Sequence, residues 1–347
     1  MAPSFFWRLV LTESIEEVAV AQFKLVILTE AIPVFDQTEW VWKDGKMVRW
    51  DLATIHVSAH ALHYGSGVFE GIRCYVTEEG PAVFRLGAHL RRFSASAEVY
   101  GIPIPYSEDE LRQAVVECIR INNYTSCYVR PICYYGSDTL GVHPRQCPVE
   151  VAILTWPWEA YLGDEGLKTG VRITVSPWLK FDSQMVPTTA KACGQYLNSM
   201  LAVRDAVRRG YDEALLLDSD GYIAEGSGEN LFIVRDGRLF TNDEQSSILM
   251  GVTRDAVIQL AGDMGLEVRI GKLQLGDLLS CDEAFFTGTA AEVTPIRELD
   301  GNVIGGGGRG PITLKIQEAF FGATGGRNSR YRKWLDFVAE RPVETMV

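Results

Sequence analysis

Two Asp-Gly pairs, one in each half of the chain, constrain the fold more than any other feature of the sequence. Asp44-Gly45 follows an apolar run that begins near Val41, and Asp236-Gly237 separates two strand-like runs within residues 230–241. An Asp-Gly pair between such runs predicts a tight β-hairpin. We therefore expect antiparallel strands in both halves, with ordered sheet beginning near Val41.

Helical patterns alternate with further strand-like runs. Ser107 and Glu110 form a capping box, and the apolar residues that follow at four-residue spacing predict a helix over about residues 108–121. Such alternation predicts a mixed α/β fold. Further helices are expected near 195–210, 251–265 and 311–321, and further strands at 126–135, 151–155, 171–175 and 213–218.

The chain has 347 residues, which corresponds to about two domains at the usual ~150 residues each. A stretch with two glycines and a change to charged residues suggests the boundary between them. We expect a small α/β domain at 41–162, an interdomain loop at 163–169 and a larger domain at 170–347. Residues 1–40 form an N-terminal extension of unknown role.

Charge and cysteine content exclude several classes of partner. The 33 Lys and Arg against 45 Asp and Glu give a net charge of −12, which argues against nucleic-acid binding. No run reaches the ~18 apolar residues of a membrane span. The seven cysteines contain no C-x-x-C pair, so neither a disulfide framework nor a metal site is expected, and a reducing cytoplasm fits best.

Four local features could together bind one cofactor. Lys191 has small and apolar neighbours, as a Schiff-base lysine requires, and Glu225 follows it between two strands. Residues 251–253 open a helix, and residues 288–292 form a small-residue turn, so both could bind anions. Each feature alone also has an ordinary structural explanation. Together they supply what pyridoxal 5'-phosphate needs, since its aldehyde carbon, ring nitrogen and phosphate must all be held.

Six motifs extend this pattern from about Val41 to the C-terminus. They occupy residues 63–73, 128–131, 189–192, 225–232, 251–254 and 288–295. In the residues and the order of these motifs, the chain closely resembles the branched-chain amino acid aminotransferases of bacterial type. These enzymes belong to the class IV, or fold type IV, pyridoxal-phosphate enzymes.

The resemblance implies a fold and a set of cofactor contacts. The small N-terminal α/β domain would be followed by a larger C-terminal α/β domain of pseudo-barrel form, with pyridoxal 5'-phosphate between them. Lys191 would be the catalytic, Schiff-base lysine, Glu225 would bond the ring nitrogen, and Tyr196 would bond the phenolic oxygen. The phosphate would be bound by Arg92, Val252, Thr253 and Thr289.

The resemblance also implies the reaction and its substrates. Branched-chain L-amino acids (leucine, isoleucine and valine) would pass their amino group to 2-oxoglutarate, giving branched 2-oxo acids and L-glutamate. The substrate's α-carboxylate is expected at Thr289 and Ala290, and Val142 of a homodimer's second subunit would help to close the pocket. The side-chain pocket would be lined by Tyr64, Phe69, Tyr128, Arg130, Trp158 and Tyr161.

Other functions remain open at this point. A D-amino acid or (R)-amine transaminase of the same fold shares the lysine, glutamate and phosphate site, although residues 128–130 and 288–292 favour the branched-chain type. Aminodeoxychorismate lyase, also of class IV, eliminates rather than transaminates. A non-enzymatic ligand-binding protein is an alternative from a different class.

Overall fold

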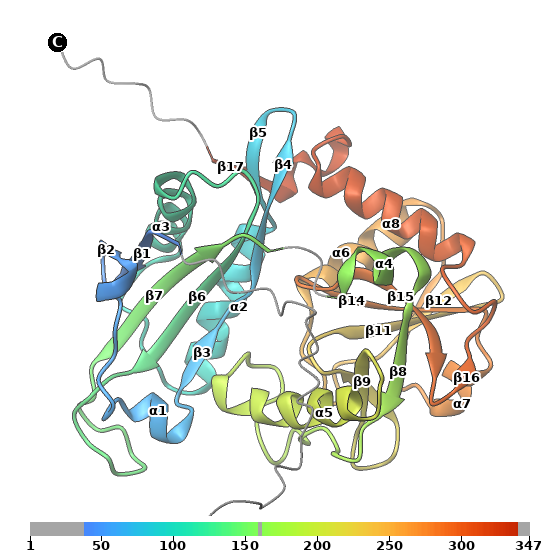
Figure 1. Cartoon of the computed structure of the whole chain (residues 1–347), viewed down its shortest axis with the longest axis horizontal. Coiled ribbons are helices and arrows are strands. Elements are labelled where there is room, and N and C mark those ends of the chain that lie inside the picture. The colour runs from blue at the N-terminus through green and yellow to red at the C-terminus, as the bar shows by residue number, and fades with distance from the viewer. Residues whose placement is uncertain (1–37, 159–161, 339–347) are drawn as a thin grey trace, which may run out of the picture. The chain divides into compact units, whose positions relative to one another are not determined.

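Two β-sheets organise the part of the chain that the computed structural model describes, residues 38–158 and 162–338 (Figure 1). The first sheet has eight strands in the order β17-β5-β4-β6-β7-β1-β2, with β3 paired to β6. Its strands are β1 (Trp40–Lys43), β2 (Lys46–Arg49), β3 (Gly67–Phe69), β4 (Ile72–Thr77), β5 (Gly80–Phe84), β6 (Cys127–Tyr135), β7 (Val149–Trp156) and β17 (Leu335–Phe337).

The second sheet has nine strands in the order β10-β9-β8-β15-β14-β11-β12-β13, with β16 paired to β15. An isolated bridge between Ile223 and Leu273 joins β10 to the residues just after β13, so the two ends of this order meet in a barrel-like path. The strands are β8 (Val171–Val175), β9 (Glu213–Leu217), β10 (Ile223–Gly226), β11 (Asn230–Arg235), β12 (Arg238–Thr241), β13 (Val268–Ile270), β14 (Glu283–Gly288), β15 (Glu292–Leu299) and β16 (Asn302–Val303).

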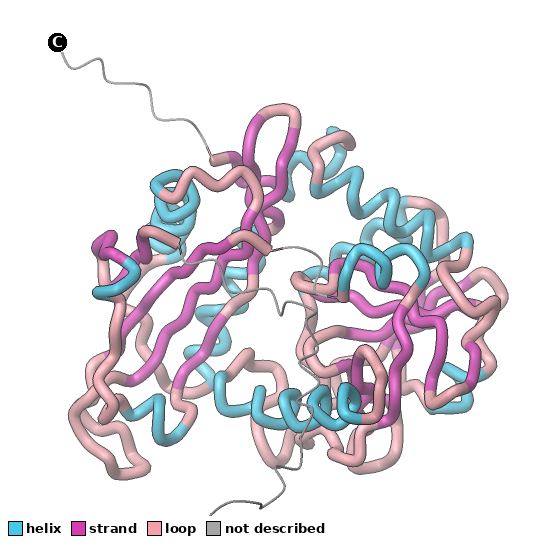
Figure 2. Tube along the Cα trace, in the orientation of Figure 1, coloured by secondary structure: helices cyan, strands magenta, loops and turns pink. Residues whose placement is uncertain are grey.

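Helices cover these sheets, and Figure 2 shows them in cyan beside the magenta strands. The first sheet carries α2 and α3, and the second carries α5, α6 and α8. The α-helices are α1 (His60–Tyr64), α2 (Leu86–Val99), α3 (Glu108–Ile121), α4 (Gly163–Thr169), α5 (Tyr196–Arg208), α6 (Val252–Asp263), α7 (Leu275–Leu279) and α8 (Pro311–Thr324). The short 3-10 helices are η1 (Trp50–Leu52), η2 (Cys193–Gln195) and η3 (Ser329–Trp334).

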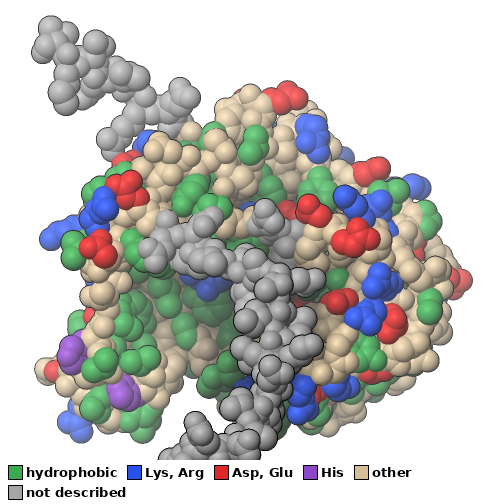
Figure 3. All heavy atoms as spheres, in the orientation of Figure 1, with side chains coloured by type: hydrophobic (Ala, Val, Ile, Leu, Met, Phe, Trp, Pro, Cys, Tyr) green, Lys and Arg blue, Asp and Glu red, His purple; other side chains and the backbone are tan. Residues whose placement is uncertain are grey.

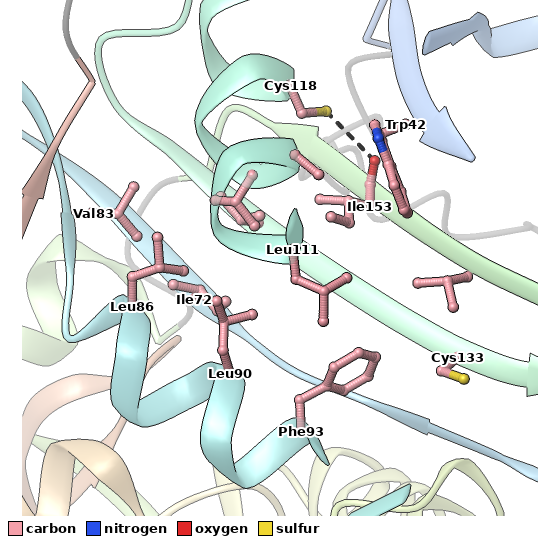
Figure 4. Packing of buried hydrophobic residues seen from close by; sticks show 14 of the residues in the cluster. Trp42, Ile72, Val83, Leu86, Leu90, Phe93, Leu111, Cys118, Cys133 and Ile153 are labelled. Atoms are coloured by element: carbon pink, nitrogen blue, oxygen red, sulfur yellow. Dashed lines mark hydrogen bonds between the residues drawn. The ribbon is translucent and has the colours of Figure 1, made fainter. Parts of the chain in front are cut away.

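The apolar core of the first sheet lies between its strands and the helices α2 and α3. Leu90 and Phe93 of α2 and Leu111 of α3 are fully buried against Ile72 and Ile153 of the strands, as Figure 4 shows. Burying side chains of this size stabilises the fold by roughly 1.5–3 kcal/mol each. This packing fixes α2, the helix that carries Arg92, against the sheet.

A second core joins the two sheets. It contains Phe232 and Phe285 of the second sheet, which stack with ring centroids 5.1 Å apart, together with Phe84 of β5 and Trp334 of η3. The Phe84 ring packs edge-on against Trp334, and β17 then pairs with β5. The C-terminal segment therefore returns to the first sheet. The expected domain of residues 170–347 does not account for this pairing.

The mixed α/β class expected from the sequence is confirmed, and so are both hairpins. The capping box is also present, since Ser107 accepts from the Glu110 amide at the start of α3. The expected interdomain loop at 163–169 is wrong, because these residues form helix α4, which packs on β15. Of the expected extension, residues 1–37 lie outside the described residues.

Charged side chains of both signs lie on the surface (Figure 3). On the face drawn in Figure 3, basic and acidic side chains are interspersed, and no continuous basic patch is visible there. None of the helices in the described residues is long and apolar enough to cross a membrane.

Candidate active site

A cavity of about 350 Å³ collects residues of both sheets. Its volume lies in the range typical of sites for small molecules. Twelve of the residues expected at the site line it. These are Phe69, Arg92, Tyr128, Arg130, Trp158, Lys191, Tyr196, Glu225, Val252, Thr253, Thr289 and Ala290.

Lys191 is held against the first sheet by its backbone. Its amide donates to Ser96 Oγ at 3.0 Å, and its carbonyl accepts from the Phe69 amide at 3.0 Å. The Nζ atom donates to the Tyr196 hydroxyl at 2.5 Å. Burial, aided by the Arg92 guanidinium, lowers the pKa of Lys191 to about 8. At neutral pH a lysine in this state has a larger fraction of free amine than an ordinary lysine.

Tyr196 begins helix α5 and remains a protonated phenol. Burial raises its pKa to about 12, although the Lys180 ammonium acts in the opposite direction. Its ring packs edge-on against Phe69, with centroids 4.7 Å apart. The hydroxyl can therefore donate a hydrogen bond to an oxygen placed beside Lys191.

Glu225 lies within β10 rather than in a turn, and its carboxylate has three protein donors. Oε2 accepts from Asn230 Nδ2 at 3.0 Å and from the Leu249 amide at 3.1 Å. Oε1 lies 2.6 Å from Lys180 Nζ. Burial lowers the pKa of Lys180, but the attraction of Glu225 outweighs it, and the pKa is raised. This ion pair holds a negative charge at one wall of the cavity.

Arg92 is aimed into the cavity by a buried network behind it. Its Nε and NH2 groups donate to the two oxygens of Glu70 at 2.6 and 2.9 Å, and His89 Nδ1 lies 2.8 Å from Glu70 Oε2. Burial raises the pKa of Glu70, but Arg92 and His89 outweigh it and hold the pKa well below its ordinary value. The remaining NH1 group donates to the Met250 carbonyl at 3.0 Å, next to the start of α6.

Two backbone segments offer amides to an anion. Gly251 precedes α6, whose first amides have no acceptor within the helix. A Cβ at Gly251 would lie 2.1 Å from Asn230 Oδ1, so only glycine fits this close approach. Thr289 and Ala290 also line the cavity, and they lie in the turn between β14 and β15. The hydroxyl of Thr287, just before this turn, is buried without a hydrogen-bond partner among residues 38–158 and 162–338.

Aromatic side chains and one arginine form the wall on the side of the first sheet. The Arg130 guanidinium carbon lies 4.7 Å from the Phe69 ring centroid and 5.3 Å from that of Tyr128. Tyr128 also contacts Trp158, with centroids 5.2 Å apart. Arg130 Nε is buried with no hydrogen-bond partner in the described part of the chain. This wall combines an apolar surface with an unused charged donor.

Three expected pocket residues are not part of this wall. Tyr64 is 44% exposed, and its hydroxyl donates to the Leu140 carbonyl at 2.5 Å. Val142 is 78% exposed, and neither residue lines the cavity. Tyr161 lies outside the described residues.

The sequence reasoning missed three charged residues of the site: Glu70, Lys180 and Glu229. Glu229 lines the cavity, and burial together with the nearby Glu213 raises its pKa well above the ordinary value. Glu70 and Glu229 lie inside motifs that were recognised, so their position could have indicated them. No pattern in the sequence marks Lys180.

The chain is similar in sequence to known proteins over the residues that form the cavity. The family described as amino-transferase class IV matches residues 67–299. The branched-chain-amino-acid aminotransferase of Escherichia coli K12 is 48% identical over 303 residues, which cover 87% of this chain and 98% of that protein. The chain belongs to the branched-chain aminotransferases of class IV.

Solved structures of this aminotransferase family share its fold. The Escherichia coli branched-chain amino acid aminotransferase has a TM-score of 0.86 at 48% identity, covering 87% of this chain and all of that one. The branched-chain amino acid aminotransferase of Thermobaculum terrenum, solved in its PLP (holo) form, has a TM-score of 0.82 at 33% identity. That match covers 87% of this chain and 99% of the Thermobaculum terrenum chain.

Proposed function

We propose that this protein is a pyridoxal-phosphate-dependent branched-chain-amino-acid aminotransferase. It transfers the amino group of leucine, isoleucine or valine to 2-oxoglutarate, giving branched 2-oxo acids and L-glutamate. The observation that carries the proposal is the partly buried Lys191, whose pKa is lowered to about 8 in a cavity that also holds the Glu225 carboxylate and the start of α6. Membership of the family and the PLP form of the Thermobaculum terrenum relative support it.

The residues of the cavity fit pyridoxal phosphate. Lys191 would bind its aldehyde carbon, Tyr196 would donate to its phenolic oxygen, and Glu225 would pair with its ring nitrogen. The phosphate would lie against the free amides at Val252 and Thr253, where helix geometry favours a negative charge. Arg92 and Thr289 would complete its contacts. Arg92 uses three of its five N–H donors on Glu70 and Met250, so two remain for a phosphate.

Once bound, the cofactor supplies an electron sink for the charge that develops when the substrate loses its Cα proton. Lys191 Nζ removes that proton as general base and then donates it, as general acid, to the C4′ carbon of the cofactor. A pKa of about 8 leaves roughly a tenth of the amine unprotonated at pH 7, against less than a thousandth for an ordinary lysine. The environment of Lys191 therefore increases the amount of amine that can act as the base.

One pocket must accept both an aliphatic side chain and a carboxylate. The rings of Phe69, Tyr128 and Trp158 bury a leucine side chain, a contribution of roughly 1.5–3 kcal/mol. The second carboxylate of 2-oxoglutarate would cost several kcal/mol if left unpaired. Arg130, with its unpartnered Nε, can supply the charge-assisted hydrogen bond. The α-carboxylate common to both substrates would bind at the Thr289 and Ala290 amides.

We also propose a homodimer and two domains, one at 41–162 and one from 170 onward, except that the C-terminal strand β17 belongs to the sheet of the first domain. Tyr64 and Val142 are exposed apolar residues near one another, since Tyr64 bonds to Leu140 two residues before Val142. Exposed apolar residues of this kind often mark a partner surface. In the dimer, Val142 of one subunit would close the pocket of the other. The cytoplasm is the compartment that its cysteine content favours.

A substrate panel tests the proposed function. Purified protein is loaded with pyridoxal phosphate and assayed with L-leucine, L-isoleucine and L-valine in the presence of 2-oxoglutarate. L-amino acids should react far faster than D-amino acids or (R)-amines, and borohydride should abolish the cofactor's absorbance band. Preference for a D-amino acid or an (R)-amine, lyase activity on aminodeoxychorismate, or no covalently bound cofactor would overturn the proposal.

A further inference from the structure

Lys180 is placed at the cavity by its backbone, independently of its ammonium group. Its amide donates to the Leu217 carbonyl of β9 at 2.8 Å. The preceding residue, Leu179, is held through its carbonyl by Asn198 Nδ2 of α5 at 3.0 Å. The side chain of Lys180 is only 13% exposed and lines the same cavity as Lys191. Its position is thus built into the second sheet and the helix that covers it.

The hydrogen bonds of Glu225 leave one acceptor position free. An ionised carboxylate offers about four lone-pair positions on its two oxygens. Asn230 and the Leu249 amide use the two on Oε2, and Lys180 uses one on Oε1. The remaining position therefore lies on Oε1, the oxygen that Lys180 holds.

We propose that Lys180 is a positioning residue for the ring nitrogen of pyridoxal phosphate, an inference that rests on the function proposed above. Its ammonium lies 2.6 Å from Glu225 Oε1 and fixes the direction of that oxygen, so that the oxygen accepts a hydrogen bond from a protonated ring nitrogen. Lys180 acts on the ring nitrogen through Glu225.

The charges around Glu225 explain why a cation is needed there. Glu225 is buried, and the carboxyl of Glu229 also lines the cavity. Of the other groups nearby, Tyr196 is a neutral phenol and Lys191 has a lowered pKa. Without Lys180, Glu225 Oε1 would lose the cation 2.6 Å away that compensates its buried charge and fixes its direction. The hydrogen bond from the ring nitrogen would then weaken, and the ring nitrogen would give up its proton more readily.

The test compares two variants that differ in charge. Lys180→Gln keeps a neutral hydrogen-bond donor, and Lys180→Arg keeps the charge. Lys272→Gln is the control, because Lys272 Nζ lies 3.6 Å from Asp220 in another lysine–carboxylate pair and does not line the cavity. Each holoenzyme is loaded with pyridoxal phosphate labelled with ¹⁵N in the ring, and the ¹⁵N chemical shift and the leucine kinetics are measured.

The Gln variant should move the ¹⁵N shift toward that of an unprotonated pyridine and lower kcat by about tenfold or more. Lys180→Arg and Lys272→Gln should keep the wild-type shift and stay within about threefold of its kcat. If the Gln variant does not fold, Lys180→Met, which needs no hydrogen-bond partner, takes its place. A wild-type ¹⁵N shift in the neutral variant overturns the inference, whereas a wild-type protein without cofactor or transaminase activity overturns the proposed function itself.

Discussion

Replacing Arg130 by methionine should separate the two half-reactions of the enzyme. Methionine keeps an unbranched apolar chain beside the Phe69 and Tyr128 rings, but it removes the charged donor whose Nε is unpartnered among the described residues. A hydrogen bond to a charged group contributes about 1.5–3 kcal/mol. At about 1.4 kcal/mol per factor of ten, kcat/KM for 2-oxoglutarate should fall roughly 10- to 150-fold.

The half-reaction with leucine should change much less, because the aliphatic side chain needs only the apolar wall. Loss of the stacked guanidinium there is worth about 0.5–1 kcal/mol, which is about a two- to fivefold effect. Single-turnover absorbance of the cofactor follows each half-reaction separately. Arg235→Met is a matched control, since Arg235 stacks on Phe240 at 5.1 Å and does not line the cavity. An equal loss for leucine and 2-oxoglutarate would refute the assigned role of Arg130.

Three further changes test other parts of the site. Lys191→Ala should leave the melting temperature near that of the wild type while turnover falls by more than about a hundredfold, and residual activity above that level would contradict its role. Glu213 is fully buried with Oε2 unpartnered among the described residues, and burial raises its pKa from the ordinary 4.5. Its folded form therefore retains a proton that the unfolded chain loses, so its contribution to stability declines as pH rises above about 4.5. Glu213→Gln should accordingly raise the melting temperature relative to wild type more at about pH 8 than at about pH 5, and a pH-independent difference would count against this. Val142→Asp should raise KM for leucine without changing the cofactor absorbance, and a fully active monomer of 38.6 kDa in light scattering would refute the shared pocket.

The sequence by itself determined the features that depend on neighbouring residues. Ser107 and Glu110 cap α3, and both Asp-Gly pairs turn between adjacent strands, because these interactions span only a few residues. The motifs around Lys191 and Glu225 could be recognised from the sequence because each is a short run of consecutive residues. Helix α4 was missed because its sequence contains two glycines. The helix packs on β15, and a Cβ at Gly166 would lie 3.2 Å from Val171, so tertiary contact stabilises it and intrinsic propensity does not.

Only the tertiary structure decided the charge state of the site. Lys180 and Glu225 are 45 positions apart in sequence, and nothing in either local pattern predicts their 2.6 Å contact. The same holds for Glu70, which becomes the partner of Arg92 and His89 when α2 packs on the first sheet. A sequence names ionisable groups, but their pKa values depend on burial and on charges a few ångströms away. Those distances exist only after the sheets and helices have packed.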